Sequence, residues 1–462
     1  GAAFDGTLSL QASTASGVAR FAAQGATVTL PGLAKVAGDF AFGVDRVPVE
    51  DGVTQIIVIG AANAAGTVTL GDLVANVSNA SLGLVLKSVS AASGIGGMTR
   101  TTALSGVADL SLTVDDTFSL TGTQVSLRYN GTGEAISAQA TLPSGAALYI
   151  EMAAEESRIA GQITAEVVGQ GSFSGQLELV ITDALRILSD AAQTQVAVKE
   201  YLLAGAALKA RLGGDSGLSV EDGAGALVYA KAKDGSGAWL ATKGTLSLAS
   251  LGGIALQGAE DDAWSVNTVV SGTGSALDWT AVKSVDLPSV GSVVFDQVGE
   301  IFHVAASGQF ALGGASLAGD VAATYTKTTG AWSLRFAEMS VVLAAGPAML
   351  RLSGAGGTLN VDSNGRRSGS LSGALSLTGI TGLIAEATGT LTLDGLDEAL
   401  SVNATGVLGL DGFARVAGDF SITREISVDG PQLVVAATGA TLQVGAGVKA
   451  ASSETMVTGA VD

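Results

Sequence analysis

The stretch Leu33-Ala34-Lys35-Val36-Ala37-Gly38-Asp39-Phe40 returns near the other end of the chain as Phe413-Ala414-Arg415-Val416-Ala417-Gly418-Asp419-Phe420. Weaker copies lie at residues 159–163 and 317–321. A second landmark, a strand start of the form G-T-L-S-L, occurs with variants at residues 6–10, 108–112, 244–248, 373–377 and 389–393. Similar segments at long separations indicate a repeat architecture, in which each unit packs on its neighbours.

A third recurring feature has the pattern of an apolar strand, a turn of small residues and a second strand. It occurs at residues 55–70, 196–212, 334–352 and 433–444. The order of the landmarks predicts three diverged units, at 1–105, 106–243 and 244–388, and a truncated fourth unit at 389–462. Units on the order of 130 residues are longer than helical or propeller repeats, so each is expected to contain several strands. We expect the chain to be a fragment of a longer protein.

Alternation of apolar and polar residues predicts strands. In residues 108–120, Leu110 and Leu112 alternate with Asp109 and Ser111. Hairpins are predicted at residues 231–239, 324–332 and 361–366. Two of them contain an Asp-Gly or Asn-Gly pair, which in a two-residue turn needs positive φ at both positions. The turns join antiparallel neighbours.

These patterns predict an all-β fold with an elongated, repetitive architecture and no substantial helix. The geometry is either β-solenoid-like or an antiparallel meander built from hairpins. Residues 182–212 are compatible with a helix, but we favour strands because residues 196–212 align with β-patterned copies elsewhere.

Composition narrows the classes of function. Of the 462 residues, 47% are hydrophobic, 14% are charged and only 5% are aromatic, which suits thin β-layers better than one thick core. The net charge of −19 leaves no basic surface for nucleic acid. Cysteine is absent, which excludes disulfides, thiolate catalysis and cysteine zinc sites. No run of 18 apolar residues is present, so no membrane span is predicted.

One segment resembles a catalytic motif. Residues Gly214-Asp215-Ser216-Gly217 are similar to the nucleophile motif of trypsin-like serine proteases. That mechanism needs a histidine base, which precedes the serine in those enzymes, whereas the single histidine of this chain is His303. A lone imidazole also cannot form a histidine metal site. We therefore predict no enzyme and no catalytic, cofactor-binding or metal site.

Paired carboxylates occur at Asp115-Asp116, Glu155-Glu156 and Glu260-Asp261-Asp262. Neighbouring side chains of a strand point to opposite faces, so such pairs do not share a proton. We interpret them as solvated turns that bind calcium weakly at most. The aspartate of the A-G-D-F element is replaced by Gln162 in one copy, so it is expected at a strand edge or bulge and not in a metal site.

Three Ala-Trp pairs, ending in Trp239, Trp264 and Trp332, each follow a predicted turn. An exposed row of indoles would stack on sugars, whereas a repeated packing role would bury them. We favour the buried interpretation, because repeats reproduce their packing first.

Together with Val125-Ser126-Leu127-Arg128-Tyr129-Asn130-Gly131-Thr132-Gly133, these landmarks resemble the repeat regions of giant secreted or surface proteins of Gram-negative bacteria, which are linked to type I secretion and to hemolysin-like or adhesin-like architectures. The resemblance implies an extracellular or cell-surface location and a rod, filament, stalk or coat. Expected partners are other copies or neighbouring repeats, with cell-surface or glycan contact. The alternative is an adhesive module that binds glycans or calcium through its loops. Calcium repeats of the type G-G-x-G-x-D are absent from this sequence.

Overall fold

The computed structural model describes residues 3–13, 18–30, 33–49, 52–70, 73–91, 99–213, 217–251, 254–257, 263–272, 274–280, 285–287, 291–312, 315–326, 329–379, 381–394, 399–411, 413–427, 430–444 and 458–461. Strands make up 83% of the chain, and the described residues contain no helix. The all-β prediction is therefore confirmed. Residues 182–212 fall in strands, as the alignment of the repeats indicated.

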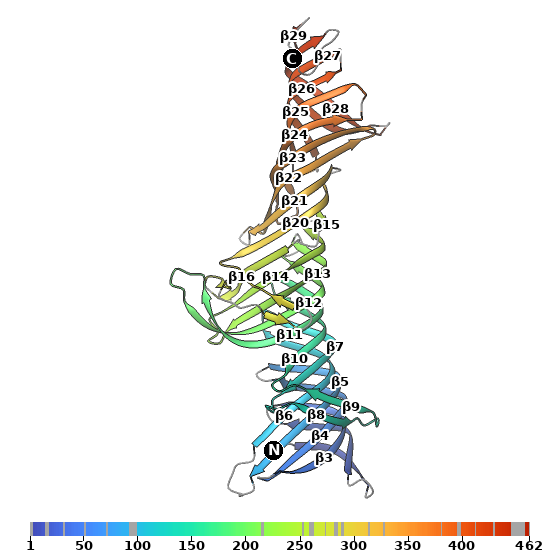
Figure 1. Cartoon of the computed structure of the whole chain (residues 1–462), viewed down its shortest axis with the longest axis vertical. Coiled ribbons are helices and arrows are strands. Elements are labelled where there is room, and N and C mark those ends of the chain that lie inside the picture. The colour runs from blue at the N-terminus through green and yellow to red at the C-terminus, as the bar shows by residue number, and fades with distance from the viewer. Residues whose placement is uncertain are drawn as a thin grey trace.

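Of the 29 described strands, 25 form one antiparallel sheet, and 23 of these follow one another as a long meander. Figure 1 shows this sheet wound along the long axis of a rod, with β3 and β4 near one end and β27 and β29 near the other. The first half of the meander comprises β1 (Ala3–Ser13), β2 (Val18–Leu30), β3 (Ala34–Val49), β4 (Gly52–Leu70), β5 (Leu73–Ala91), β6 (Thr99–Asp115), β7 (Phe118–Asn130), β10 (Ser157–Val167), β11 (Gly171–Leu188), β12 (Gln195–Leu212), β13 (Leu218–Ala232) and β14 (Gly237–Leu251).

The meander continues through β16 (Ala263–Gly272), β20 (Ile301–Leu312), β21 (Ala315–Thr326), β22 (Ala331–Ala345), β23 (Ala348–Val361), β24 (Arg367–Thr378), β25 (Leu383–Asp394), β26 (Ala399–Leu410), β27 (Ala414–Ser427), β28 (Gly430–Val444) and β29 (Thr458–Val461). Two short strands join its edges, since β15 (Ile254–Gln257) pairs with β14 and β17 (Leu277–Asp278) pairs with β11. Two further pairs lie outside the sheet, β8 (Ile136–Thr141) with β9 (Ala147–Met152) and β18 (Val285–Leu287) with β19 (Gly291–Val293).

Bulges bend many of the long strands. Asn63 in β4 and Glu338 in β22 have left-handed backbone conformations, with φ of 50° and 54°, and the pairing register shifts at both. A bulge adds one unpaired residue and increases the local twist and bend. The bulges therefore help a flat ladder to become the wound sheet of Figure 1.

Because of such bulges, the prediction of a turn between two strands is wrong for three of its four segments. The segments 55–70, 196–212 and 433–444 each lie within a single strand, β4, β12 or β28, whereas only residues 334–352 contain a true reversal, between β22 and β23. The small residues mark a left-handed residue at Asn63, Ala207 or Gly439 inside the strand. One inserted residue bends a strand without reversing it, so the local sequence looks like a turn although the chain continues forward.

The A-G-D-F element lies at bulges, which is one of the two positions expected for its aspartate. The register shifts at Asp39, Asp320 and Asp419. Asp39 accepts a hydrogen bond from the backbone N–H of the left-handed Gly25 (3.1 Å) and from Asn63 Nδ2 (3.3 Å). A Cβ added to Gly38 would lie 2.9 Å from Ala64 Cα, so glycine is needed where the bulged neighbour approaches.

The three predicted hairpins are present, but the expected two-residue turns are wrong. Gly235 and Gly365 have φ of 78°, whereas Asp234 and Asn364 do not have positive φ. The Gly365 N–H donates to the Asp362 carbonyl (2.9 Å), and the Asp362 carboxylate accepts from the N–H groups of Asn364 and Arg366 (2.8 and 2.9 Å). The side-chain hydrogen bonds of Asp362 stabilise a longer loop, in which only glycine needs the left-handed region.

One continuous core runs along the inside of the wound sheet, from Ala23 in β2 to Ile422 in β27. Strands that are far apart in the meander meet across it. Phe118 of β7 stacks on Tyr229 of β13 with ring centroids 4.3 Å apart, and Phe173 of β11 lies 5.8 Å from Trp264 of β16. Such pairs contribute about 0.5–1.5 kcal/mol beyond the burial of their area. Side-chain packing thereby joins parts of the sheet that are not neighbours in the strand order.

The outer face of the sheet is covered in two places, each with its own core. The hairpin β8–β9 packs Ile150 and Met152 on Val85 and Ala103 of β5 and β6. Residues 274–280 and 291–300 place Trp279 and Phe295 on the outer face of β12–β14. In these two regions both faces of the sheet are buried, and two of the three polar clusters described below lie beside them.

Candidate functional site

The first cluster of polar contacts surrounds Asp115, the last residue of β6. It lies at the seam between β7 and β13, where the turn after β6 meets β13. The Asp115 carboxylate accepts hydrogen bonds from the backbone N–H groups of Thr117 (2.8 Å) and Phe118 (3.0 Å). It also accepts from the Tyr229 hydroxyl (2.7 Å) and forms an ion pair with Lys231 (3.0 Å). The turn after β6 is thus fastened to a strand more than 100 residues further along the chain.

This environment shifts both ionisable groups. Partial burial acts to raise the pKa of Asp115, but hydrogen bonds from Thr117, Tyr229 and Lys231 outweigh it and hold the pKa well below its usual range. Burial, together with the neighbouring Asp115 carboxylate, raises the pKa of the Tyr229 hydroxyl. Asp115 is thus a charged acceptor and Tyr229 a neutral donor, an arrangement suited to holding two strands together.

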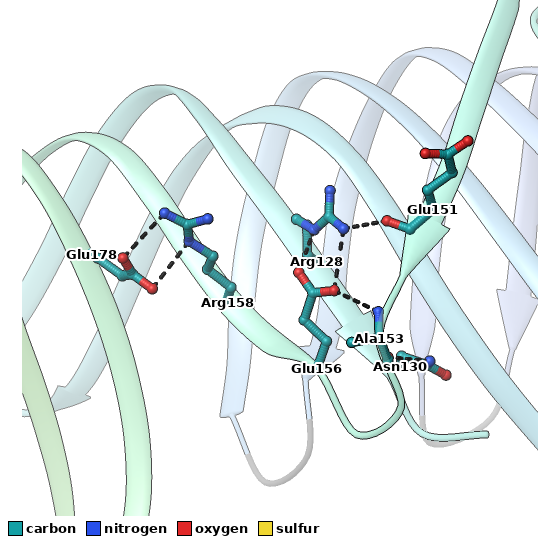
Figure 2. A network of polar contacts seen from close by, with 7 residues as sticks. All are labelled: Arg128, Asn130, Glu151, Ala153, Glu156, Arg158 and Glu178. Atoms are coloured by element: carbon teal, nitrogen blue, oxygen red, sulfur yellow. Dashed lines mark hydrogen bonds and ion pairs between the residues drawn. The ribbon is translucent and has the colours of Figure 1, made fainter. Parts of the chain in front are cut away.

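A second polar network lies where the inserted hairpin β8–β9 leaves the sheet (Figure 2). The Arg128 guanidinium donates to both carboxylate oxygens of Glu156 and to the Glu151 carbonyl. Hydrogen bonds from Arg128 lower the pKa of Glu156. Beside this pair, Arg158 of β10 forms an ion pair with Glu178 of β11 (3.0 Å).

Asn130 anchors the two ends of the same insertion. Its buried side-chain amide donates to the carbonyls of Glu134 (2.7 Å) and Ala153 (2.6 Å). Its oxygen accepts from the backbone N–H and the hydroxyl of Thr132 (3.0 and 2.6 Å). Residues 130–133 therefore form the base of the hairpin β8–β9. The side-chain amide of Asn130 makes all its hydrogen bonds within the chain.

The third cluster fastens the second outer cover. Asn267 is fully buried, donates to the carbonyls of Leu277 (2.7 Å) and Gly299 (2.8 Å), and accepts from Trp279 Nε1 (3.0 Å). Arg186 forms a bidentate pair with Glu200 and lies 5.3 Å from the centre of the Trp279 ring. These contacts fix the position of Trp279 over the sheet.

The tryptophans of the Ala-Trp pairs are core residues, as predicted. Trp239, Trp264 and Trp332 are 4%, 0% and 1% exposed. The Trp239 indole N–H donates to the Ser275 carbonyl (3.0 Å) and so helps to hold the outer cover. None of the three offers a face to a sugar.

The remaining residues singled out in the sequence do not converge. His303 is exposed on β20, between Ser265 of β16 and Thr324 of β21 in the register. Glu155 is exposed in the turn before β10, whereas Glu156 and Asp115 are partly buried, so the solvated-turn interpretation is incomplete for these two carboxylates. Ser216 and the acidic run at 260–262 lie outside the described residues. Over the described ranges, no group of three or more His, Asp or Glu side chains is placed to hold a metal ion.

The seam of Asp115 and the cover of Asn267 were missed by the sequence analysis. Asp115 and Tyr229 are 114 positions apart, and no local pattern joins them. A usable signal was present in the continuous apolar runs Leu202-Leu203-Ala204 and Ala226-Leu227-Val228, because a strand without alternation is covered on both faces. Such runs predict that a cover exists but not which segment supplies it.

No known protein family, curated protein or solved structure matches this chain. No helix that is long and apolar enough to cross a membrane occurs in the described part.

Proposed function

We propose that this chain is a structural segment of a large extracellular bacterial protein, in which it forms a rod, stalk, filament or coat. The observation that carries the proposal is the single core that runs along the wound sheet from β2 to β27. The three polar clusters support it, because each joins segments of the chain to one another. On this proposal the chain acts by its length and stiffness and not by catalysis.

The shape can be tested by small-angle scattering on the intact chain. A compact globule of this length would have a radius of gyration of about 23 Å. We expect a clearly larger value and the scattering profile of a rod. A value near that of the globule would remove the rod, whatever the location of the protein.

The location needs a separate test. An antibody raised against the chain should label intact cells of the source organism as strongly as permeabilised cells. A periplasmic or cytosolic protein labelled in parallel provides the control for cell integrity. Labelling that requires permeabilisation would contradict the extracellular part of the proposal and leave the rod unaffected.

A further inference from the structure

A small pocket opens where β16, β20 and β21 meet the turn between β10 and β11. It has a volume of about 310 Å³, and its walls include Gln170, Thr268, Glu300, Phe302 and Tyr325. This volume is at the lower end of the range for small-molecule sites. Neither the rod proposal nor the three polar clusters requires it.

Two aromatic rings form one wall of the pocket. Phe302 and Tyr325 are half-buried neighbours on β20 and β21, with ring centroids 5.1 Å apart and planes inclined by 56°. Behind them the buried Trp332 meets Phe302 edge-on at 4.8 Å and Tyr325 at 5.0 Å. Because Trp332 supports both rings, the aromatic wall is held in place before any ligand arrives.

A carboxylate stands at the rim. Glu300 is exposed, and its Oε1 accepts a hydrogen bond from the hydroxyl of the buried Thr268 (3.3 Å). The described residues that line the pocket include no lysine or arginine. The site therefore combines two aromatic rings with a negative carboxylate, on a chain whose net charge is −19.

We propose that this pocket binds an alkylammonium group, either the side chain of a lysine or a quaternary ammonium head. An organic cation places its positive charge near Glu300 and its methyl or methylene groups against Phe302 and Tyr325. A metal ion fits less well, since calcium takes six to eight oxygen ligands and the pocket supplies a single carboxylate. An anion would be repelled by the same carboxylate.

Two other pockets among the described residues lack this combination. The pocket beside Trp239 contains Lys233, and the indole N–H there already donates to Ser275. The groove over β24–β28 is lined by hydroxyls such as Ser372 and Thr390, and its one aromatic residue, Phe420, is buried. Of these three pockets, the one at Phe302 and Tyr325 has the chemistry that selects a cation.

Titration calorimetry on the intact chain tests the proposal, with choline and N-acetyl-lysinamide as probes. Saturable binding in the millimolar range is expected for at least one of them, and higher salt should weaken it. The neutral isostere 3,3-dimethylbutanol should bind at least tenfold more weakly than choline. Tighter binding of choline identifies a quaternary head as the source, and tighter binding of lysinamide identifies a lysine side chain.

Two variants locate the site. Tyr325→Leu should lower the affinity about tenfold, and Glu300→Gln several-fold. Tyr149→Leu and Glu166→Gln, an exposed aromatic residue and an exposed carboxylate elsewhere, are the matched controls and should bind as the parent does. Glu300→Gln changes only an exposed side chain, so it remains informative if Tyr325→Leu does not fold.

Two results would overturn the proposal. One is the absence of saturable binding by both ammonium probes, and binding of methyl glucoside in that case would identify a sugar site. The other is equal binding of dimethylbutanol and choline, which would make the pocket merely apolar.

Discussion

The strands β23–β26 and β12–β14 belong to the same sheet but differ in how many of their faces are buried. In β23, Leu350 and Leu352 are buried and Met349 and Arg351 are exposed, so one face packs on the core and the other meets water. In β13 every residue from Gly225 to Ala230 is buried. The difference is the outer cover around Trp279, whereas none of the described segments forms such a cover on β23–β26.

This comparison indicates how the rod combines repetition with local elaboration. A strand covered on one face needs only alternation and a bulge, and these can be repeated along the chain. A strand covered on both faces needs a matching second layer, whose polar backbone must also be satisfied. In this chain Asn267 meets that need, since it binds Leu277, Gly299 and Trp279 at once.

The largest effect is expected from removing the outer cover. Trp279→Ala empties a fully buried site that contacts Phe295 and Arg186. We expect a loss of about 3–5 kcal/mol in the stability of this region, measured as faster hydrogen exchange of the β12–β14 amides. Exchange in β23–β26 should stay unchanged, because stability in a quasi-linear array is local. Equal acceleration in both regions would show that the rod unfolds as one unit.

The matched control uses the other cover. Tyr149 in β9 is also aromatic but is 68% exposed, and Tyr149→Ala should change stability by less than about 0.5 kcal/mol. A loss comparable with that of Trp279→Ala would mean that a mere reduction in aromatic content, and not the burial of Trp279, destabilises the chain.

The second prediction concerns the seam at Asp115. Asp115→Asn keeps the shape but removes the charge that accepts from Thr117 and Tyr229 and pairs with Lys231, so we expect a loss of about 2 kcal/mol. Because the pKa of Asp115 is lower in the folded chain than in the unfolded chain, this contribution is complete above the unfolded value of about 3.9. It is lost as the pH falls below that value, toward the folded pKa.

Urea denaturation at a series of pH values measures this contribution. The difference in stability between the parent chain and Asp115→Asn should be constant from about pH 5 to 8 and should narrow below about pH 4. A difference that does not narrow in acid would show that the asparagine disturbs packing and that the carboxylate charge is not responsible.

The comparison also explains what the sequence could predict. Alternation such as that of Leu110 and Leu112 specifies a strand and its buried face, so the all-β class follows from local chemistry. The sequence left the aspartate of the A-G-D-F element at a strand edge or a bulge, and the structure places it at a bulge. Which residues meet across the seam, such as Asp115 with Tyr229, depends on the pitch with which the sheet winds around the rod. The pitch is the combined result of many bulges, and no single segment of the sequence specifies it.

The third prediction concerns the bulges that produce the winding. In Gly38→Ala the new Cβ would lie 2.9 Å from Ala64 Cα and 3.0 Å from the Ala62 carbonyl oxygen. Because the backbone must shift to avoid these contacts, we expect the free energy of unfolding to fall by about 1–2 kcal/mol, as measured by urea denaturation. Gly43→Ala in the same strand meets nothing closer than Val58 O at 3.9 Å and should be neutral or slightly stabilising. Similar losses at both positions would assign the effect to β3 as a whole and not to the bulge.

The smallest expected effect has the opposite sign and tests the bulge from its other side. Glu338 is exposed and has φ of 54°, a conformation that costs a side chain about 1–2 kcal/mol and costs glycine little. Glu338→Gly should therefore stabilise the chain by about 0.5–1 kcal/mol after the added freedom of the unfolded chain is subtracted. Ser370→Gly, at an exposed strand position without positive φ, should instead destabilise it by a similar amount. If both glycines destabilise, Glu338 is not strained, and the bend at β22 must come from packing against Met339 and Gly319, which lie together across the bulge.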